Sequence, residues 1–134
     1  MRVLVVDDDS NVRSALRRLL VLKYRAEVVE AEDGSVALQR LLRGGVDLVL
    51  LDMHMRTMDG METLRAIRRS PTHGDTPVIM LTGSSDEGLI RQAISLGVED
   101  YLVKPVDGVL LFSRIAAVMA RCGKEPLLTA RVAS

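Results

Sequence analysis

Five short apolar runs, each followed by a polar turn and a segment with helical spacing, organise this sequence. The runs lie at about residues 3–6, 26–31, 46–51, 78–81 and 99–103. Three of them are almost continuously apolar, which is typical of strands covered on both faces. Five alternating strand–helix units predict an α/β fold, in which a five-stranded parallel sheet is doubly wound, with helices on both faces.

The segments between the runs have the spacing of amphipathic helices. Apolar residues at i, i+3, i+4 and i+7 form one stripe that faces the core. Asp9 or Ser10 is expected to cap the first helix, so Asp9 is interpreted as a helix-start residue and not as a ligand. The positions predicted to face inward are Val12, Ala15, Leu16, Leu19, Leu20, Ala37, Leu38, Leu41, Leu42, Met61, Leu64, Ile67, Ile90, Ala93, Ile94, Leu111, Ile115, Val118 and Met119.

Length and composition exclude several classes of protein. The 134 residues fit one domain, expected at residues 1–122 and followed by a tail at 123–134. The 18 basic and 18 acidic residues cancel, and aromatic residues make up only 2%, which argues against direct binding of nucleic acid. No apolar run approaches the ~20 residues of a membrane span. The single Cys122 fits a reducing compartment, so we expect a cytoplasmic protein with no membrane partner.

Polar side chains follow four of the five predicted strands. Asp7 and Asp8 follow the first strand, Asp52 the third, Thr82 the fourth and Lys104 the fifth. Open parallel sheets bind ligands outside the carboxyl ends of their strands. A solvent-facing edge accounts for one or two polar residues, but not for acids, a hydroxyl and an amine that converge on one edge.

This set of groups suits a divalent cation and a phosphoryl group. Clustered carboxylates repel one another unless a cation is present. Oxygen ligands without His or Cys favour Mg²⁺, and a hydroxyl and an ammonium group can hold the remaining phosphoryl oxygens. A carboxylate can also be a nucleophile and form an aspartyl-phosphate. The spacing alone does not say which aspartate would be attacked.

Five motifs follow one another along the chain: Val3-Leu4-Val5-Val6-Asp7-Asp8-Asp9, Leu48-Val49-Leu50-Leu51-Asp52, Met58-Asp59-Gly60, Val78-Ile79-Met80-Leu81-Thr82-Gly83 and Asp100-Tyr101-Leu102-Val103-Lys104-Pro105. In this order they resemble the receiver domain of two-component response regulators, in particular the chemotaxis-type single-domain regulators. The resemblance covers about residues 2–121 and implies a flavodoxin-like (βα)5 fold with strand order 2-1-3-4-5.

The resemblance also implies a phosphorylation and metal site. Asp52 matches the phosphorylated aspartate. Mg²⁺ (or Mn²⁺) would be bound by Asp8 directly, by Asp7 through water, by Asp52 and by the backbone carbonyl of His54.

The remaining matched positions belong to the switch. Thr82 matches the hydroxyl that turns to the phosphoryl group, and Gly83 the small residue that leaves the phosphoryl pocket open. Lys104 matches the ammonium that pairs with a phosphoryl oxygen, and Lys104–Pro105 a peptide bond that is cis in the family. Tyr101 matches an aromatic side chain that points inward in the active state and outward in the inactive one.

One position departs from the family pattern and two others vary within it. Arg56 replaces the usual proline four residues after the phosphorylated aspartate, which frees the loop and adds a cation near the site, unless its guanidinium points to solvent. His54 and Ser84 match positions that tune the access of water to the acyl phosphate. The alternative for His54 is a plain exposed side chain at the rim.

The resemblance implies a signalling switch and not an enzyme beyond self-phosphorylation and slow self-dephosphorylation. Asp52 would accept phosphate from a histidine kinase or phosphotransfer protein. A face at about residues 87–96 and 101–121 would then signal to a target protein, from a monomer or a phosphorylation-linked dimer.

Three alternatives to a stand-alone switch stay open. The chain could be one receiver of a larger regulator or hybrid kinase. It could instead be a pseudo-receiver that works without phosphate. The third is an aspartate-nucleophile phosphatase. Such enzymes have a second aspartate two residues after the first, and His54 at that position argues against this alternative.

Overall fold

The computed structural model describes residues 1–83 and 87–123, and the α/β prediction is confirmed. Apart from Gly123, the expected tail lies outside the described residues, as does Ser84. No helix within the described part of the chain is long and apolar enough to cross a membrane. The elements are β1 (Arg2–Val6), α1 (Ser10–Tyr24), β2 (Glu27–Ala31), α2 (Gly34–Leu42), β3 (Leu48–Asp52), α3 (Gly60–Arg69), β4 (Val78–Thr82), α4 (Glu87–Ser95), β5 (Asp100–Val103) and α5 (Gly108–Arg121).

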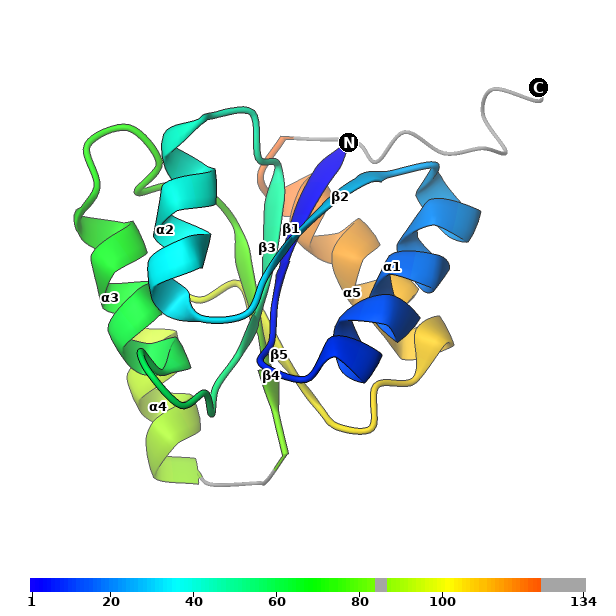
Figure 1. The fold of residues 1–134 in the computed structure, drawn as a ribbon. Helices are drawn as coiled ribbons and strands as arrows, with labels where there is room; N and C mark the ends of the chain where they lie inside the picture. The colour runs from blue at the N-terminus through cyan, green and yellow to red at the C-terminus, as the bar shows by residue number, and fades with distance from the viewer. Residues whose placement is uncertain (84–86, 124–134) are drawn as a thin grey trace.

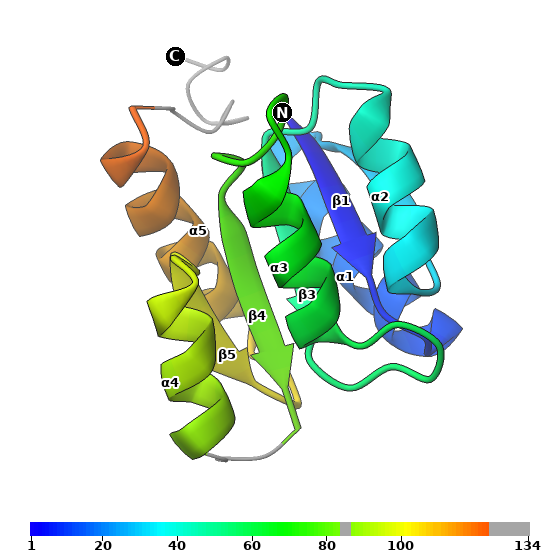
Figure 2. The same cartoon turned by 90° about the vertical axis from the view of Figure 1, so that its left-hand side faces the viewer.

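The five strands form one parallel sheet in the order β2-β1-β3-β4-β5, as predicted. Helices α2, α3 and α4 cover one face of this sheet, and α1 and α5 cover the other (Figures 1 and 2). The chain runs outward from β1 to β2 and then crosses to β3 on the other side of β1. Open α/β sheets bind ligands at such a reversal, beyond the carboxyl ends of the strands, which lie at the bottom of Figure 1.

The sheet divides the core into two layers. Along β1, Val3 and Val5 pack into the layer beneath α1 and α5, whereas Leu4 and Val6 pack into the layer beneath α2, α3 and α4. Every residue of β3 and β4 is buried. This two-sided burial explains why these strands appear in the sequence as continuous apolar runs.

Aspartate side chains cap four of the helices. Asp9, Asp33, Asp59 and Asp107 precede α1, α2, α3 and α5, and each side chain accepts a hydrogen bond from a backbone N–H of the first turn. Glu62 completes a capping box with Asp59. All four helices begin next to the carboxyl edge of the parallel sheet, and the caps of α1, α3 and α5 fix the loops next to the polar residues predicted there.

Three inward positions were predicted wrongly. Ala15 is exposed, Leu42 is 74% exposed and Ile94 is 56% exposed. A helix that lies on a sheet buries a narrow stripe, and the i, i+3, i+4 rule selects a wider one. In α4 that stripe narrows to Ala93, the one fully buried residue of the helix.

Candidate functional site

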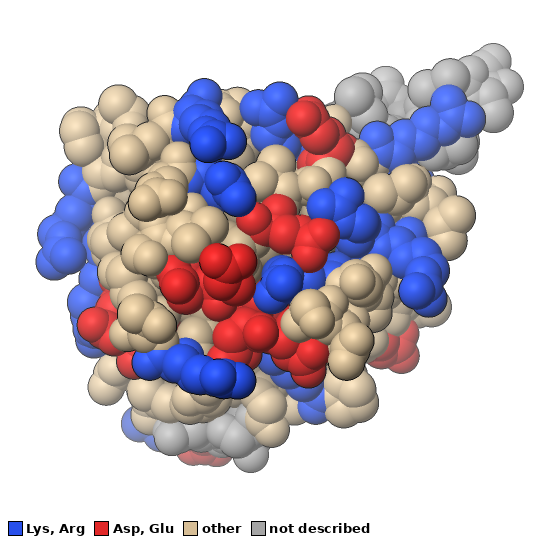
Figure 3. Space-filling model, viewed as in Figure 1, with Lys and Arg blue, Asp and Glu red and all other residues tan. Residues whose placement is uncertain are grey.

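The carboxyl edge of the sheet brings together the polar residues that follow the strands. Asp7 and Asp8 follow β1, Asp52 ends β3, Thr82 ends β4 and Lys104 follows β5. One carboxylate oxygen from each of the three aspartates lies within 4.8 Å of the others. Acidic side chains gather in the middle and lower part of the face in Figure 3, where β1 and β3 end.

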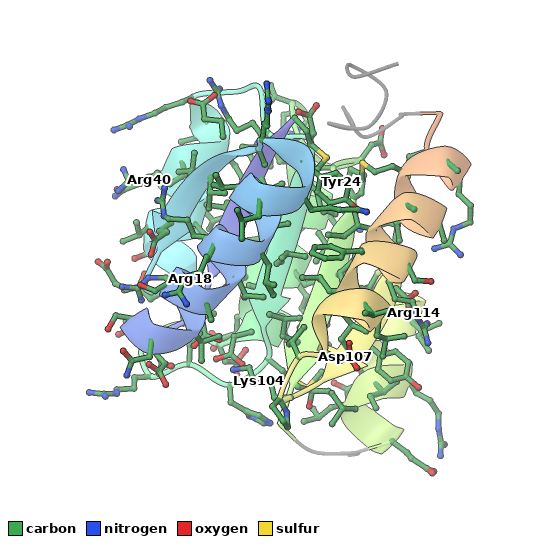
Figure 4. All side chains as sticks on the ribbon, turned by 90° about the vertical axis from the view of Figure 1, so that its right-hand side faces the viewer. Arg18, Tyr24, Arg40, Lys104, Asp107 and Arg114 are labelled. Carbon is green, nitrogen blue, oxygen red and sulfur yellow. The ribbon has the colours of Figure 1, made fainter. Side chains whose placement is uncertain are left out.

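Lys104 connects the two buried aspartates. Its Nζ donates to Asp7 Oδ2 at 2.7 Å and to Asp52 Oδ1 at 3.1 Å, from the loop that follows β5 (Figure 4). Burial by itself would lower the pKa of Lys104. The hydrogen bonds and charges of Asp7 and Asp52 outweigh this effect and raise that pKa, so the ammonium is held in its charged form.

Asp52 is 3% exposed. Burial, and then the charge of Asp7, raise the pKa of Asp52 against the opposing effects of Lys104 and of the His54 N–H, which lies 3.4 Å from Oδ1. A carboxylate in this setting is stabilised by any further cation. Its position at the end of a central, fully buried strand also leaves it little freedom to move.

Asp7 and Asp8 differ in their surroundings although they are neighbours. Asp7 is buried, and its Oδ1 accepts from the Asp9 N–H at 2.9 Å, while its backbone carbonyl accepts from Arg13. Asp8 is exposed, and its Oδ2 lies 3.9 Å from Nε of Arg56. The pair therefore offers one fixed carboxylate and one that can adjust to a ligand.

The three aspartates fit a hard divalent cation. All three offer oxygen atoms. Among residues 1–83 and 87–123, no His or Cys side chain belongs to the cluster, and the charge of Lys104 does not fully balance it. Mg²⁺ favours one or two carboxylates together with water and phosphoryl oxygens. The donor set matches that preference.

Gly60 holds the loop at residues 53–59 against the end of β3, a feature that the sequence analysis missed. Its N–H donates to the Met53 carbonyl at 3.0 Å. A Cβ on Gly60 would lie 2.3 Å from the carbonyl oxygen of Asp52 and 2.7 Å from Cα of Met53. The Asp59–Gly60 pair predicted a helix start, but only the fold shows that it packs against the backbone of Asp52.

The residues predicted as a switch surround the same edge. Thr82 is fully buried, and a Cβ on the neighbouring Gly83 would meet no atom within 4 Å, so space is open there. The Lys104–Pro105 bond is cis, as the resemblance implied. Tyr101 lies on the exposed side of β5. His54 is exposed, as expected for a side chain at the rim.

A mainly apolar groove, also missed from the sequence, lies beside the site. It has a volume of about 540 Å³ and runs between α1 and the loop after β5. Lys104 of the site and Gly83, which follows Thr82, are among the residues that line the groove. The apolar part is formed by Val12, Ala15, Leu16, Leu19, Pro105 and Val106.

Comparisons with known proteins agree with this geometry. The family model of the response regulator receiver domain matches residues 3–116. The transcriptional regulatory protein CpxR of Escherichia coli is 42% identical over 120 residues, which cover 90% of this chain and 50% of CpxR. The response regulator PleD of Caulobacter vibrioides is 38% identical over 118 residues, which cover 87% of this chain and 26% of PleD.

A solved structure of the chemotaxis protein CheY4 of Vibrio cholerae superposes with a TM-score of 0.82 at 29% identity, covering 87% of this chain and 97% of CheY4. By contrast, the chain spans about half the length or less of the curated relatives CpxR and PleD. The family model spans almost the whole described domain, and the fold and the acidic residues and lysine at the carboxyl edge of the sheet agree with it. This chain therefore belongs to the response regulator receiver domain family.

Proposed function

We propose that the chain is a switch that accepts a phosphoryl group on Asp52 in the presence of Mg²⁺. The observation that carries this proposal is the meeting of three carboxylates with the ammonium of Lys104 at the end of β3. Asp52 is the member of this set that belongs to a strand and contacts Lys104. It is also the position that the family resemblance assigns to the phosphorylated residue.

In the transfer step, an Asp52 oxygen attacks phosphorus and the bond from phosphorus to the donor nitrogen of a phosphohistidine breaks. Lys104 then pairs with a phosphoryl oxygen that carries negative charge. Asp8, Asp7 through water, Asp52 and the His54 carbonyl would hold Mg²⁺ (or Mn²⁺). When bound, the metal ion neutralises charge on the phosphoryl oxygens. Hydrolysis of the acyl phosphate resets the switch slowly, and His54, Ser84 and Arg56 tune its lifetime.

The switch step links this edge to the face formed by α4, β5 and α5. The hydroxyl of Thr82 turns to the phosphoryl group, and Gly83 leaves room for that group. Tyr101, exposed in this structure, then moves inward. A local change of charge would thus bias an element that has two arrangements.

Two surfaces suit the expected protein partners. The apolar groove along α1 lies next to Lys104, so a histidine kinase or phosphotransfer protein could dock there and present its phosphohistidine to Asp52. The second surface is formed by α4, β5 and α5. Its exposed apolar side chains are Ile94, Tyr101, Val103 and Leu110. We propose this face for a target protein, or for a second copy of the chain after phosphorylation.

Intact-mass measurement after incubation with acetyl phosphate tests the proposal. We expect an adduct of one phosphoryl group with Mg²⁺, and none with a chelator or in Asp52→Asn. Asp33→Asn is the matched control, because Asp33 caps α2 and does not belong to the cluster of Asp7, Asp8 and Asp52. An adduct that persists in Asp52→Asn would refute the site. A wild-type chain that binds beryllium fluoride but shows no adduct would point to a short phosphoryl lifetime.

A further inference from the structure

The charge of Asp8 is balanced differently from that of the other two aspartates. Asp7 and Asp52 both accept a hydrogen bond from Lys104. Asp8 does not contact this lysine. Among residues 1–83 and 87–123, the one cation within ion-pair distance of Asp8 is Arg56, with Nε 3.9 Å from Oδ2. Lys104 thus pairs with Asp7 and Asp52, and Arg56 pairs with Asp8.

Arg56 reaches Asp8 from a different element. It lies in the loop between β3 and α3, and its side chain is 91% exposed. Within the described residues, the ion-pair partner of this guanidinium is the carboxylate of Asp8. A proline, the residue that the family pattern has here, offers no cation and no such contact.

The net charge of the cluster explains why this contact matters. Counted over the described residues, the three carboxylates and Lys104 leave two negative charges uncompensated, and Arg56 reduces this to one. An arriving divalent cation meets the same Asp8 oxygens. It is also repelled by the guanidinium at their side.

We propose that Arg56 is a built-in competitor of the divalent cation: its guanidinium pairs with Asp8 in the metal-free protein and must move away when Mg²⁺ binds. This inference rests on the magnesium site of the proposed function. It makes Arg56 a residue that sets the Mg²⁺ concentration at which the switch becomes competent, acting through Asp8.

The size of the effect follows from the exposure of the pair. Exposed ion pairs change an equilibrium by up to about fivefold and are screened by salt. Removing the guanidinium should therefore tighten Mg²⁺ binding by about three- to fivefold at low salt. The difference should shrink at high salt, where the screening length falls to about 3 Å.

Calorimetric titration of MgCl₂ into the whole chain tests this without using phosphorylation. The variants are Arg56→Gln, Arg56→Lys and, as a matched control, Arg43→Gln. Arg43 is exposed at the end of α2, at the opposite edge of the sheet, and has the same charge to lose. We expect tighter binding in Arg56→Gln, and binding close to wild type in Arg56→Lys and Arg43→Gln.

Each other result has a distinct meaning. Equal or weaker binding in Arg56→Gln would overturn the competition. An equal gain in Arg43→Gln would overturn it too, because net charge alone would then explain the effect. If the wild type binds Mg²⁺ and Arg56→Gln does not differ from it, the proposed function still stands. If no variant binds Mg²⁺, the magnesium site itself is refuted, and the inference falls with it.

Discussion

Replacing Asp52 by asparagine should make the metal-free protein more stable at neutral pH. The carboxylate is almost completely buried and lies within 4.8 Å of an oxygen of Asp7 and of Asp8. Asparagine keeps the shape of the side chain and the oxygen that accepts from Lys104 and from the His54 N–H. The substitution therefore removes a buried charge and leaves its main hydrogen bonds possible.

The magnitude follows from opposing electrostatic contributions. With an effective dielectric constant of about 20, the attraction between Asp52 and Lys104 at 3.1 Å is about 5 kcal/mol, and the repulsion from Asp7 at up to 4.8 Å is at least about 3.5 kcal/mol. Exposed Asp8 adds roughly 1 kcal/mol of repulsion, because water screens it. These contributions nearly cancel, so the cost of burying the carboxylate remains. We expect a gain of about 1–2 kcal/mol in the free energy of unfolding.

The gain should depend on pH in a defined direction. Burial raises the pKa of Asp52 above its usual value of 3.8. Below that value the carboxyl is protonated in both the folded and the unfolded wild type, and burying its charge costs nothing. As the pH rises from 3.8 through the raised pKa, the contribution of Asp52 to wild-type stability falls, and the variant lacks this contribution. The difference should therefore be near zero at acidic pH and should reach its full size above the raised pKa of Asp52.

Urea unfolding followed by circular dichroism in a chelator measures this difference at several pH values. Asp33→Asn is a control with the opposite sign, because hydrogen bonds from the Val36 and Ser35 backbone and the Ser35 hydroxyl lower the pKa of Asp33. Saturating Mg²⁺ should stabilise the wild type more than Asp52→Asn, by mass action. A less stable Asp52→Asn at pH 7, or a gain of equal size at acidic pH, would refute the reasoning.

Three further substitutions probe the framework of the site. Gly60→Ala should lower the free energy of unfolding by about 1–3 kcal/mol, because its Cβ would overlap the Asp52 carbonyl; thermal unfolding measures this, and an unchanged midpoint would contradict it. Lys104→Ala leaves the buried carboxylates of Asp7 and Asp52 without their cation. Chemical unfolding should therefore show a lower free energy of unfolding at pH 7 and a smaller decrease in acid. A decrease in this free energy that does not vary with pH would argue against this. Arg68→Gln removes a guanidinium that donates to four backbone carbonyls and to Glu99. Amide hydrogen exchange in the turn between α4 and β5 should therefore become faster than in the wild type. Exchange rates in this turn that do not differ from the wild type would count against this anchoring role.

Much of the fold was predictable because its determinants are local. The buried strands β3 and β4 appear as apolar runs since both of their faces are covered. Aspartates mark four helix starts, because a side-chain oxygen there satisfies free backbone N–H groups. The errors at Leu42 and Ile94 arose where a helix turns an apolar residue away from the sheet, which helical spacing alone does not reveal.

The order of the elements could be predicted from local sequence, and so could the residues that lie at one edge of the sheet, since each of these polar residues ends or follows a strand. How the charges at this edge pair with one another depends on the three-dimensional packing. Lys104 is 97 residues from Asp7 and 52 from Asp52, and only the strand order brings its ammonium to both. The packing of Gly60 on the Asp52 backbone and the approach of Arg56 to Asp8 likewise join different segments. Spacing along a chain does not encode such distances, because they depend on how the strands and loops pack together.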